Sequence, residues 1–487
     1  MENLFVYKFK TKKGLYVYDV NSNNFLLVNE KVFQDIDTPN WNRNPDILEG
    51  VKKGIVSSLR PQIVRPSVNY EEMKEYLDKK IQRLILFVAD SCNLKCKYCC
   101  YSEVYSDSRL LSGKLMSWDI AKKAIDFYFS HTGESINKKE EKVISFYGGE
   151  PLLNFELIKK CLEYVKSVYK TKANEVDFAI TTNLTLLNNE IMQFLTDNNI
   201  FIAISIDGPK ELHDRYRVFK DGKGTFDIVM RNIKKLYEHN KEYFRKNVVF
   251  NVVTAPPIDF IKIYEFFSSN PILSENWYGV IGGLTYTGGP CFEEIFHIDR
   301  REGFETEEKI FEIFKENVIK YGYCNNNFLL KFYYEDFWNI YNRNMKRLPQ
   351  EIVERSSCIP GQMRLLVDPD GKFYPCEKGA SSLQIGDIIH GFDYEKCYSL
   401  IEEYCKIRNE LCLNCYAIRF CKTCYIGALK GGKLDKKTKE EECKMIKVHY
   451  SNMLRRFIEI FIEIMEENPK AFEYSRKVLI PEKYFLL

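Results

Sequence analysis

The stretch 83–101, RLILFVADSCNLKCKYCCY, constrains the fold of this chain more than any other part. An apolar, β-rich run at residues 84–88 predicts a buried strand. The loop that follows carries Cys92, Cys96 and Cys99 in the spacing C-x3-C-x2-C. Thiolates at this density suit soft metal centres, and a [4Fe–4S] cluster takes one cysteine per iron. Three ligands would therefore leave one iron free to bind something else.

With Tyr98 directly before the third cysteine, this loop resembles the cluster motif of radical S-adenosylmethionine (SAM) enzymes. The resemblance implies that the free iron chelates SAM, whose reductive cleavage releases a 5′-deoxyadenosyl radical. Taken alone, the loop also fits a zinc site or three buried thiols, although zinc more often binds paired C-x2-C halves. Cys100 stands outside the pattern, as a free buried thiol or a substitute ligand.

The composition describes an ordinary globular protein of two or three domains, with 487 residues of which 45% are hydrophobic. Its 71 basic residues nearly balance 68 acidic ones, so nothing predicts a nucleic-acid or membrane partner. No export signal or spanning helix is evident, and a cytoplasmic location is expected. Because the cytosol is reducing, the 16 cysteines predict metal or redox chemistry rather than disulfides.

Residues 1–80 form a separate N-terminal segment. Alternating apolar runs at residues 15–20 and 24–28, split by Asn21, Ser22 and Asn23, predict a β-hairpin, and a helix follows from Glu30. The arrangement resembles the winged-helix-like leader-recognition element of peptide-modifying radical SAM enzymes, which binds a leader peptide as an added strand. A capping subdomain without a ligand is the alternative.

Residues 81–290 alternate between strand-like and helix-like patterns. Strands are expected at residues 84–88, 143–146, 178–181, 201–206, 248–253 and 278–281, with helices such as 119–130, 155–169 and 226–239 between them. Six β/α units predict an α/β fold with a parallel sheet, which the resemblance implies is a partial (β/α)6, TIM-like barrel. The site of such a sheet lies at the carboxyl ends of its strands.

The loops at those strand ends carry the other candidate SAM-binding residues. Two glycines in the YGGEP segment let backbone approach a ligand closely, and the following carboxylate can accept from an ammonium group. The resemblance implies SAM contacts from this segment and from a serine and an arginine farther along. The candidates for cofactor binding are Tyr98, Gly148, Gly149, Glu150, Ser205, Asp207 and Arg217. Each has an ordinary interpretation, as a turn or a surface charge, when taken singly.

Residues 291–357 predict a helical bridging region, and residues 358–450 hold a second group of cysteines. Their order resembles the SPASM extension of radical SAM enzymes, which implies two auxiliary [4Fe–4S] clusters and three clusters in all. The implied outer ligands are Cys412, Cys415, Cys421 and Cys443, and the inner ones are Cys358, Cys376 and Cys424. The Cys421-x2-Cys424 spacing is shorter than is common in that family. Residues 451–487 are expected to form a C-terminal tail with an amphipathic helix at 453–467.

The inner cluster lacks one expected ligand, because Ile352 occupies the position that supplies it in the sulfatase-maturing branch. An open iron could bind a substrate thiolate and lower its pKa, or Cys397 or Cys405 could fill the position. Glu377 stands where that branch has an aspartate acting as base, although a salt-bridged glutamate is the commoner case.

The resemblance as a whole implies a thioether-forming peptide maturase of the ranthipeptide or sactipeptide type. Its substrate would be a cysteine-containing precursor peptide, bound through its leader, and its electrons would come from a flavodoxin- or ferredoxin-type donor. The alternatives are a formylglycine-forming anaerobic sulfatase-maturating enzyme, a carbon–carbon crosslinking maturase, or a zinc-organised binding protein without catalysis.

Overall fold

The computed structural model describes residues 3–102, 109–133, 142–170, 175–275, 279–283, 303–321, 328–378 and 382–469. Several predicted features lie outside these ranges, among them Tyr278, Cys291, Cys324 and residues 470–487. Among the described residues, no helix has the length and apolar character that crossing a membrane requires.

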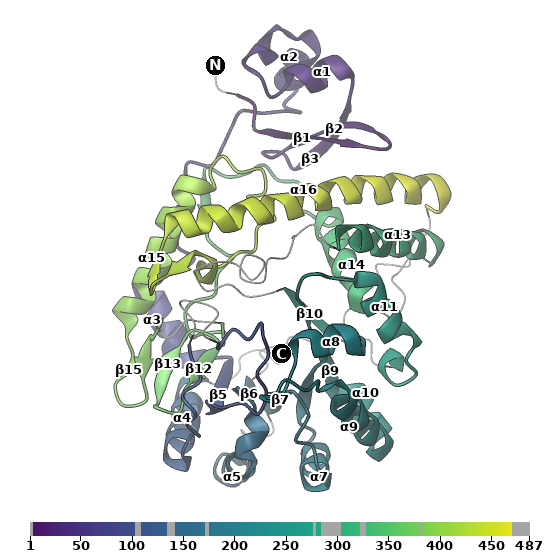
Figure 1. The fold of residues 1–487 in the computed structure, drawn as a ribbon. Coiled ribbons are helices and arrows are strands. Elements are labelled where there is room, and N and C mark those ends of the chain that lie inside the picture. Colours follow the sequence, from purple (N-terminus) through teal and green to yellow (C-terminus); the bar gives the residue numbers. More distant parts are fainter. Residues whose placement is uncertain are drawn as a thin grey trace.

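The N-terminal segment is built on a three-stranded antiparallel sheet in the order β1-β2-β3 (Figure 1). Its elements are β1 (Val6–Thr11), β2 (Gly14–Asp19), β3 (Asn24–Val28), α1 (Glu30–Asp35), the 3-10 helix η1 (Pro39–Arg43) and α2 (Pro45–Lys52). The predicted hairpin and the helix at Glu30 are confirmed, whereas β1 was not predicted. Asp19 fixes the hairpin turn, since its carboxylate accepts from the Ser22 and Ser57 amides at 2.7 and 3.0 Å.

Six parallel strands form the centre of the molecule, and each pairs with the next in chain order. They are β5 (Arg83–Ala89), β6 (Lys142–Gly148), β7 (Val176–Thr182), β8 (Phe201–Ser205), β9 (Val248–Thr254) and β10 (Gly279–Gly283). Every residue of β5 is buried, as its continuous apolar run predicts for a strand covered on both faces. The six predicted β/α units are therefore confirmed, with small shifts at their ends.

Helices cover the outside of these strands (Figure 1). They are α4 (Trp118–His131), η2 (Pro151–Asn154), α5 (Phe155–Val168), α7 (Asn189–Asp197), α8 (Lys210–Tyr216), α9 (Phe226–His239), α10 (Lys241–Asn247), α11 (Phe260–Ser269) and η3 (Leu273–Glu275). Side-chain caps begin several of them, as in α4, where the Ser117 hydroxyl accepts from the Ile120 amide.

The sheet continues beyond β5 into the part of the chain that holds the second group of cysteines. Strand β12 (Leu365–Val367) pairs in parallel with β5, and β13 (Lys372–Tyr374), β14 (Gly386–Asp387) and β15 (Gly391–Phe392) follow in antiparallel order. The result is a ten-stranded mixed sheet rather than two separate domains. This connection was not predicted, and it joins Cys376, just after β13, to the edge of the parallel strands.

The remaining elements cover the open side of the sheet and support the N-terminal segment (Figure 1). They are β4 (Ile63–Arg65), α3 (Tyr70–Lys79), α13 (Phe304–Tyr321), α14 (Phe328–Tyr341), β11 (Glu351–Val353), α15 (Tyr394–Leu411), η4 (Tyr425–Ala428), β16 (Leu429–Lys430), β17 (Lys433–Leu434) and α16 (Lys436–Glu467). The helix expected at 453–467 packs on the body of the protein but begins earlier, at Lys436. A domain boundary after residue 450 therefore falls inside one continuous helix.

Candidate active site

The three cysteines of the first loop line a cavity of about 630 Å³ at the carboxyl ends of the parallel strands. Backbone bonds fix the loop, because the Lys95 and Lys97 amides donate to the carbonyls of Val218 and Tyr216 at 2.8 and 2.9 Å. Burial raises the pKa of Cys92 to about 12 and that of Cys96 to about 11. Thiolates at these positions would need a nearby cation, which the irons of a cluster supply.

The glycine pair lies directly against the cysteine loop. The Gly149 and Glu150 amides donate to the carbonyls of Ala89 and Ser91 at 2.8 and 2.9 Å. A Cβ atom added at Gly149 would lie 2.9 Å from the Cβ of Cys92, so no larger residue fits without displacing the loop. The donor set and this close backbone approach fit a cluster-bound amino acid such as SAM.

Arg217 reaches the cavity through a buried pair with Asp207. Its Nε donates to Asp207 Oδ2 at 3.0 Å, and its guanidinium lies 5.5 Å from the centre of the Tyr98 ring. The Tyr98 hydroxyl donates to the same carboxylate oxygen. Burial opposes the charge of Arg217, but Asp207 raises its pKa well above the ordinary value. Arg217 and Ser205 line the cavity, whereas Asp207 acts behind them as the group that orients Arg217.

Glu150 does not line the cavity; its carboxylate is fully buried beneath it. It accepts hydrogen bonds from the Thr182 hydroxyl at 2.7 Å and from the Asn183 amide at 2.8 Å. Burial raises the pKa of Glu150 to about 7, although these bonds favour the charged form. In this arrangement Glu150 orders the end of β7, and Thr182 and Asn183 face the cavity in its place.

Glu377 lies next to the first loop, because it follows β13, which pairs with β12, the strand beside β5. The Tyr101 hydroxyl donates to the Glu377 carbonyl at 2.9 Å, and Arg364 forms an ion pair with Glu377 Oε1. The other carboxylate oxygen, Oε2, is buried and accepts no hydrogen bond from the described residues. Tyr101, Tyr147 and the apolar side chains of Leu110 and Leu111 also line the cavity. None of these four was predicted as a site residue, although Tyr147 belongs to the YGGEP segment and Tyr101 ends the stretch 83–101.

Of the seven cysteines in the second group, Cys412 is buried, Cys358 is exposed, and the other five are half-buried. Burial raises the pKa of Cys376, with further increases from Glu377 and Cys424, and partial burial and the charge of Cys424 also raise the pKa of Cys358. Burial likewise raises the pKa of Cys443 to about 11, and the charges of Cys412, Cys415 and Cys421 act in the same direction. The division of these seven cysteines into an inner set, Cys358, Cys376 and Cys424, and an outer set of four stays a prediction. Cys397 and Cys405 are buried, the former in the main core.

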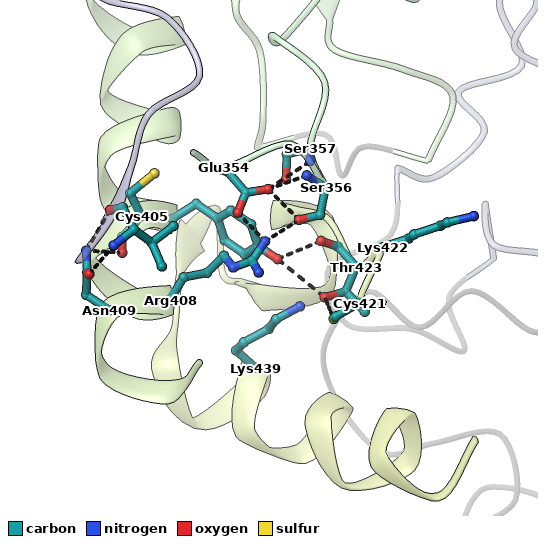
Figure 2. A network of polar contacts seen from close by, with 12 residues as sticks. Glu354, Ser356, Ser357, Cys405, Arg408, Asn409, Cys421, Lys422, Thr423 and Lys439 are labelled. Carbon is teal, nitrogen blue, oxygen red and sulfur yellow. Dashed lines mark hydrogen bonds and ion pairs between the residues drawn. The ribbon is translucent and has the colours of Figure 1, made fainter. Parts of the chain in front are cut away.

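A buried ion pair stands beside the outer set (Figure 2). Arg408 near the end of α15 pairs with Glu354, and both side chains are at most 5% exposed. The Arg408 guanidinium also donates to the Ser356 hydroxyl at 2.6 Å, and it lowers the otherwise burial-raised pKa of Cys412. Asn409 exchanges hydrogen bonds with the backbone of Val64 at 2.7 and 2.9 Å. These contacts tie β4 and β11 to the helix that delivers Cys412.

Among the described residues, no three His, Cys, Asp or Glu side chains converge on the position of a single metal ion. A mononuclear zinc site would need such convergence, with Zn–S distances of about 2.3 Å. An iron–sulfur cluster does not, because each thiolate binds its own iron.

Comparison with known proteins matches residues 86–267 to the Radical SAM superfamily. The cysteine-type anaerobic sulfatase-maturating enzyme of Clostridium novyi (strain NT) is 27% identical over 305 residues, 61% of this chain and 74% of that enzyme. The radical SAM cyclopropyl synthase TigE of Paramaledivibacter caminithermalis is 24% identical over 362 residues, 72% of this chain and 69% of that protein.

A solved structure of native anSMEcpe with bound AdoMet and Cp18Cys peptide has a similar fold. Its TM-score is 0.54 at 20% identity, and the match covers 82% of this chain and 99% of that chain. The matched residues include the cysteine loop, the glycine pair, Ser205 and Arg217, which surround one cavity. Residues 86–267 therefore form a radical SAM domain, and the protein is a SAM-dependent radical enzyme.

Proposed function

We propose that this enzyme matures a ribosomally made precursor peptide by joining a cysteine sulfur to a carbon of an acceptor residue. The chain would consist of a leader-recognition element at 1–80, the radical SAM domain, a helical bridge, a SPASM region with two auxiliary clusters, and a C-terminal tail. The observation that carries the proposal is the position of Glu377 beside the cavity of the first loop, where β12 and β13 extend the sheet from β5.

A peptide substrate is supported by the related proteins. The anSMEcpe structure holds a peptide together with AdoMet, and two relatives are named for sulfatase maturation and for cyclopropyl synthesis. In this chain the cavity carries apolar side chains, such as Leu111, next to polar ones, such as Asn183, as expected for a site that holds both SAM and a side chain.

The missing fourth inner ligand supports sulfur chemistry. Ile352 lies in β11, where it pairs with Val64 of β4. Because an isoleucine side chain is a hydrocarbon, it supplies no sulfur or oxygen ligand. Burial raises the pKa of both Cys397 and Cys405 to about 12. The charged groups that shift these two pKa values further do not include Cys358, Cys376 or Cys424. An inner cluster with three protein ligands would leave one iron for a substrate thiolate, whose pKa the metal would lower.

The chain's own residues would orient and deprotonate the substrate. When bound, the first cluster and SAM supply a radical that removes one hydrogen from a substrate carbon. The crosslink replaces one C–H and one S–H bond by a C–S bond, so a proton and an electron must also leave. Glu377 Oε2 is the candidate proton acceptor because it is buried and has no hydrogen-bond donor among the described residues. The auxiliary clusters would take the electron, and an external flavodoxin- or ferredoxin-type donor would supply the initiating one.

The N-terminal sheet supports leader binding. The order β1-β2-β3 leaves β3 as an edge strand, and its Leu27 is 66% exposed. An extended peptide can add to such an edge through backbone hydrogen bonds and place an apolar side chain against Leu27. We propose that the leader adds to β3.

Formylglycine formation is the second candidate. It is favoured by the relationship to the Clostridium novyi enzyme and by Glu377 at the position of a catalytic aspartate in that branch. It would oxidise a cysteine or serine of a sulfatase and join no two residues.

The test is anaerobic co-expression with a neighbouring open reading frame that encodes a small cysteine-rich peptide, followed by mass spectrometry. A thioether maturase removes two hydrogens per crosslink and reduces the number of alkylatable thiols. A formylglycine product in a sulfatase peptide would support the second candidate, and an unchanged peptide mass would contradict the proposal. A colourless protein that binds zinc and stays colourless after iron–sulfur reconstitution would support the non-enzymatic alternative.

A further inference from the structure

A second cavity, of about 720 Å³, lies between the N-terminal sheet and the second group of cysteines. Its walls come from the β2–β3 turn, α14, β11, the loop before η4 and α16. None of its lining residues lines the first cavity. One wall contains Cys421, so the cavity reaches from the N-terminal segment to the outer set of cysteines.

The lining of this cavity is cationic. Five of its residues are arginine or lysine, namely Arg343, Arg355, Arg408, Arg419 and Lys422, and two are acidic, Asp336 and Glu351. Both carboxylates already have partners. Glu351 forms an ion pair with Arg65 at 2.7 Å, and Asp336 lies 3.6 Å from His449.

Two of the arginines donate to backbone carbonyls rather than to carboxylates, although the charge of Asp19 partly opposes the lowering of the Arg419 pKa by burial. Arg419 donates to the backbone carbonyls of Val20, Asn21 and Lys346, and Arg343 donates to those of Asn23 and Ile340. Within the described part of the chain, neither forms an ion pair. Burial lowers the pKa of both guanidinium groups. An anion entering the cavity would offset the free-energy cost of burying these two guanidinium charges. It could be held by two parallel N–H bonds from one guanidinium.

The rim adds two exposed cations. Arg355 and Lys422 form no ion pair with any described residue, and Figure 2 shows Lys422 extending away from the Arg408–Glu354 pair. Exposed charges at a rim attract and orient an anionic partner, while the half-buried arginines bind it. The rim and the interior therefore select the same kind of ligand.

We infer that this cavity binds an acidic segment of the peptide substrate, an inference that rests on the proposed function. Its volume suits a few residues of extended peptide, and its concave shape suits a segment better than the broad face of a folded protein. The cavity begins at Asn23, directly at the turn between β2 and β3, so a peptide held by β3 could continue into it. Glutamate or aspartate side chains would meet Arg343 and Arg419.

Binding of a fluorescein-labelled hexaglutamate peptide to the reconstituted holoenzyme tests this inference by fluorescence anisotropy. We expect binding that weakens as salt is raised, and no binding of hexalysine. The double variant R355E/K422E should weaken hexaglutamate binding about tenfold, because two attractions become repulsions. Arg355→Lys with Lys422→Arg should retain binding. Lys406→Glu is the matched control, since Lys406 is exposed on α15 outside the cavity.

Equal affinity of the charge-reversed variant and the wild type would overturn the inference, as would failure of hexaglutamate to bind at low salt. Competition between hexaglutamate and an acidic flavodoxin would assign the cavity to an electron carrier instead and would also overturn it. The assay needs no turnover. Binding with the expected variant pattern, together with an unchanged precursor mass after co-expression, would remove the proposed function while leaving an acidic-peptide site.

Discussion

The two groups of cysteines differ in how the chain brings them together. Cys92, Cys96 and Cys99 lie in one loop after one buried strand, and backbone hydrogen bonds to residues 216–218 fix that loop. The cysteines of the second group come from separate turns and helices, with Cys443 inside α16 and Cys412 at the end of α15. The first site is thus local and depends on one strand end, whereas the second depends on contacts between distant segments.

The largest effect is expected in the first loop. Cys96→Ala should abolish formation of 5′-deoxyadenosine, because it removes one of three iron ligands. Among the described residues, Cys100 is the one thiol besides these three ligands that lines the cavity. The measurement is anaerobic incubation with SAM and dithionite, followed by chromatography. Cys161→Ala, in a buried thiol far from the cavity lining, is the control. Activity in C96A would show that the loop assignment is wrong.

The second group should be sensitive to a residue that binds no metal. Glu354→Gln leaves the buried Arg408 without a counter-charge, and breaking a buried pair in this way costs about 3–5 kcal/mol. Anaerobic denaturant unfolding should show this loss, and iron analysis should show less iron, if the second group holds the proposed auxiliary clusters. Glu351→Gln, three residues earlier in β11 and in an exposed pair with Arg65, should cost less than about 1 kcal/mol. Equal effects of the two substitutions would contradict the role assigned to the buried pair.

Arg217 allows a graded test of the first cavity. Arg217→Lys keeps the charge but loses the Nε bond to Asp207, so we expect the KM for SAM to rise about tenfold, as for loss of one charge-assisted hydrogen bond. Initial rates at varied SAM concentration measure this change. Arg215→Lys serves as the control, because Arg215 bonds the Pro257 carbonyl and does not line the cavity. An unchanged KM in R217K would remove Arg217 from the SAM site.

The smallest effect concerns the pH dependence of stability near the first site. His213 is fully buried, its Nδ1 accepts from the Asp207 amide, and its Nε2–H donates to Thr225. Burial lowers its pKa to about 4, with Asp207 and Asp214 opposing and Arg217 assisting the shift. The neutral His213 side chain therefore stabilises the folded protein fully above about pH 6.5, and this contribution to the free energy of unfolding is lost as the pH falls towards 4.

Between about pH 7.5 and 5.5 the wild type should lose about 1.3 kcal/mol through this group. His213→Gln should lack that component of the pH dependence in denaturant unfolding. His239→Gln is the control, since His239 is exposed at the end of α9. Identical pH profiles for H213Q and the wild type would contradict the neutral, buried state of His213.

The sequence predicted the local parts of the molecule well. Continuous apolar runs located the six parallel strands, and the carboxyl ends of such strands share one edge, so Ser205 could be expected near the cysteine loop, whereas the place of Arg217 was implied only by the family resemblance. Strands β12 to β15 escaped prediction because two or three residues carry no periodicity, and their pairing is with distant segments. Strand β1 was not predicted, although Tyr7, Lys8, Phe9 and Lys10 alternate between apolar and polar residues as a half-buried strand does.

The sequence could not predict which polar residues face a ligand. Glu150 and Asp207 looked like direct ligands, yet each holds neighbouring groups in place from beneath the cavity. The cationic cavity was also invisible, since Arg343, Arg419 and Lys422 come from separate elements and meet only in the folded chain. Local spacing predicts a site made by one loop, whereas a site assembled from distant segments requires the tertiary structure.

The most direct test of the account measures 5′-deoxyadenosine and crosslinked peptide in the same reaction for the wild type and for Cys358→Ala. If the first loop makes the radical and the second group decides its fate, removal of an inner ligand should uncouple the two. The amount of 5′-deoxyadenosine formed per crosslink should then rise at least about tenfold, as the loss of one cluster contact to the substrate allows. A parallel fall of both products, with their ratio unchanged, would contradict this division of roles.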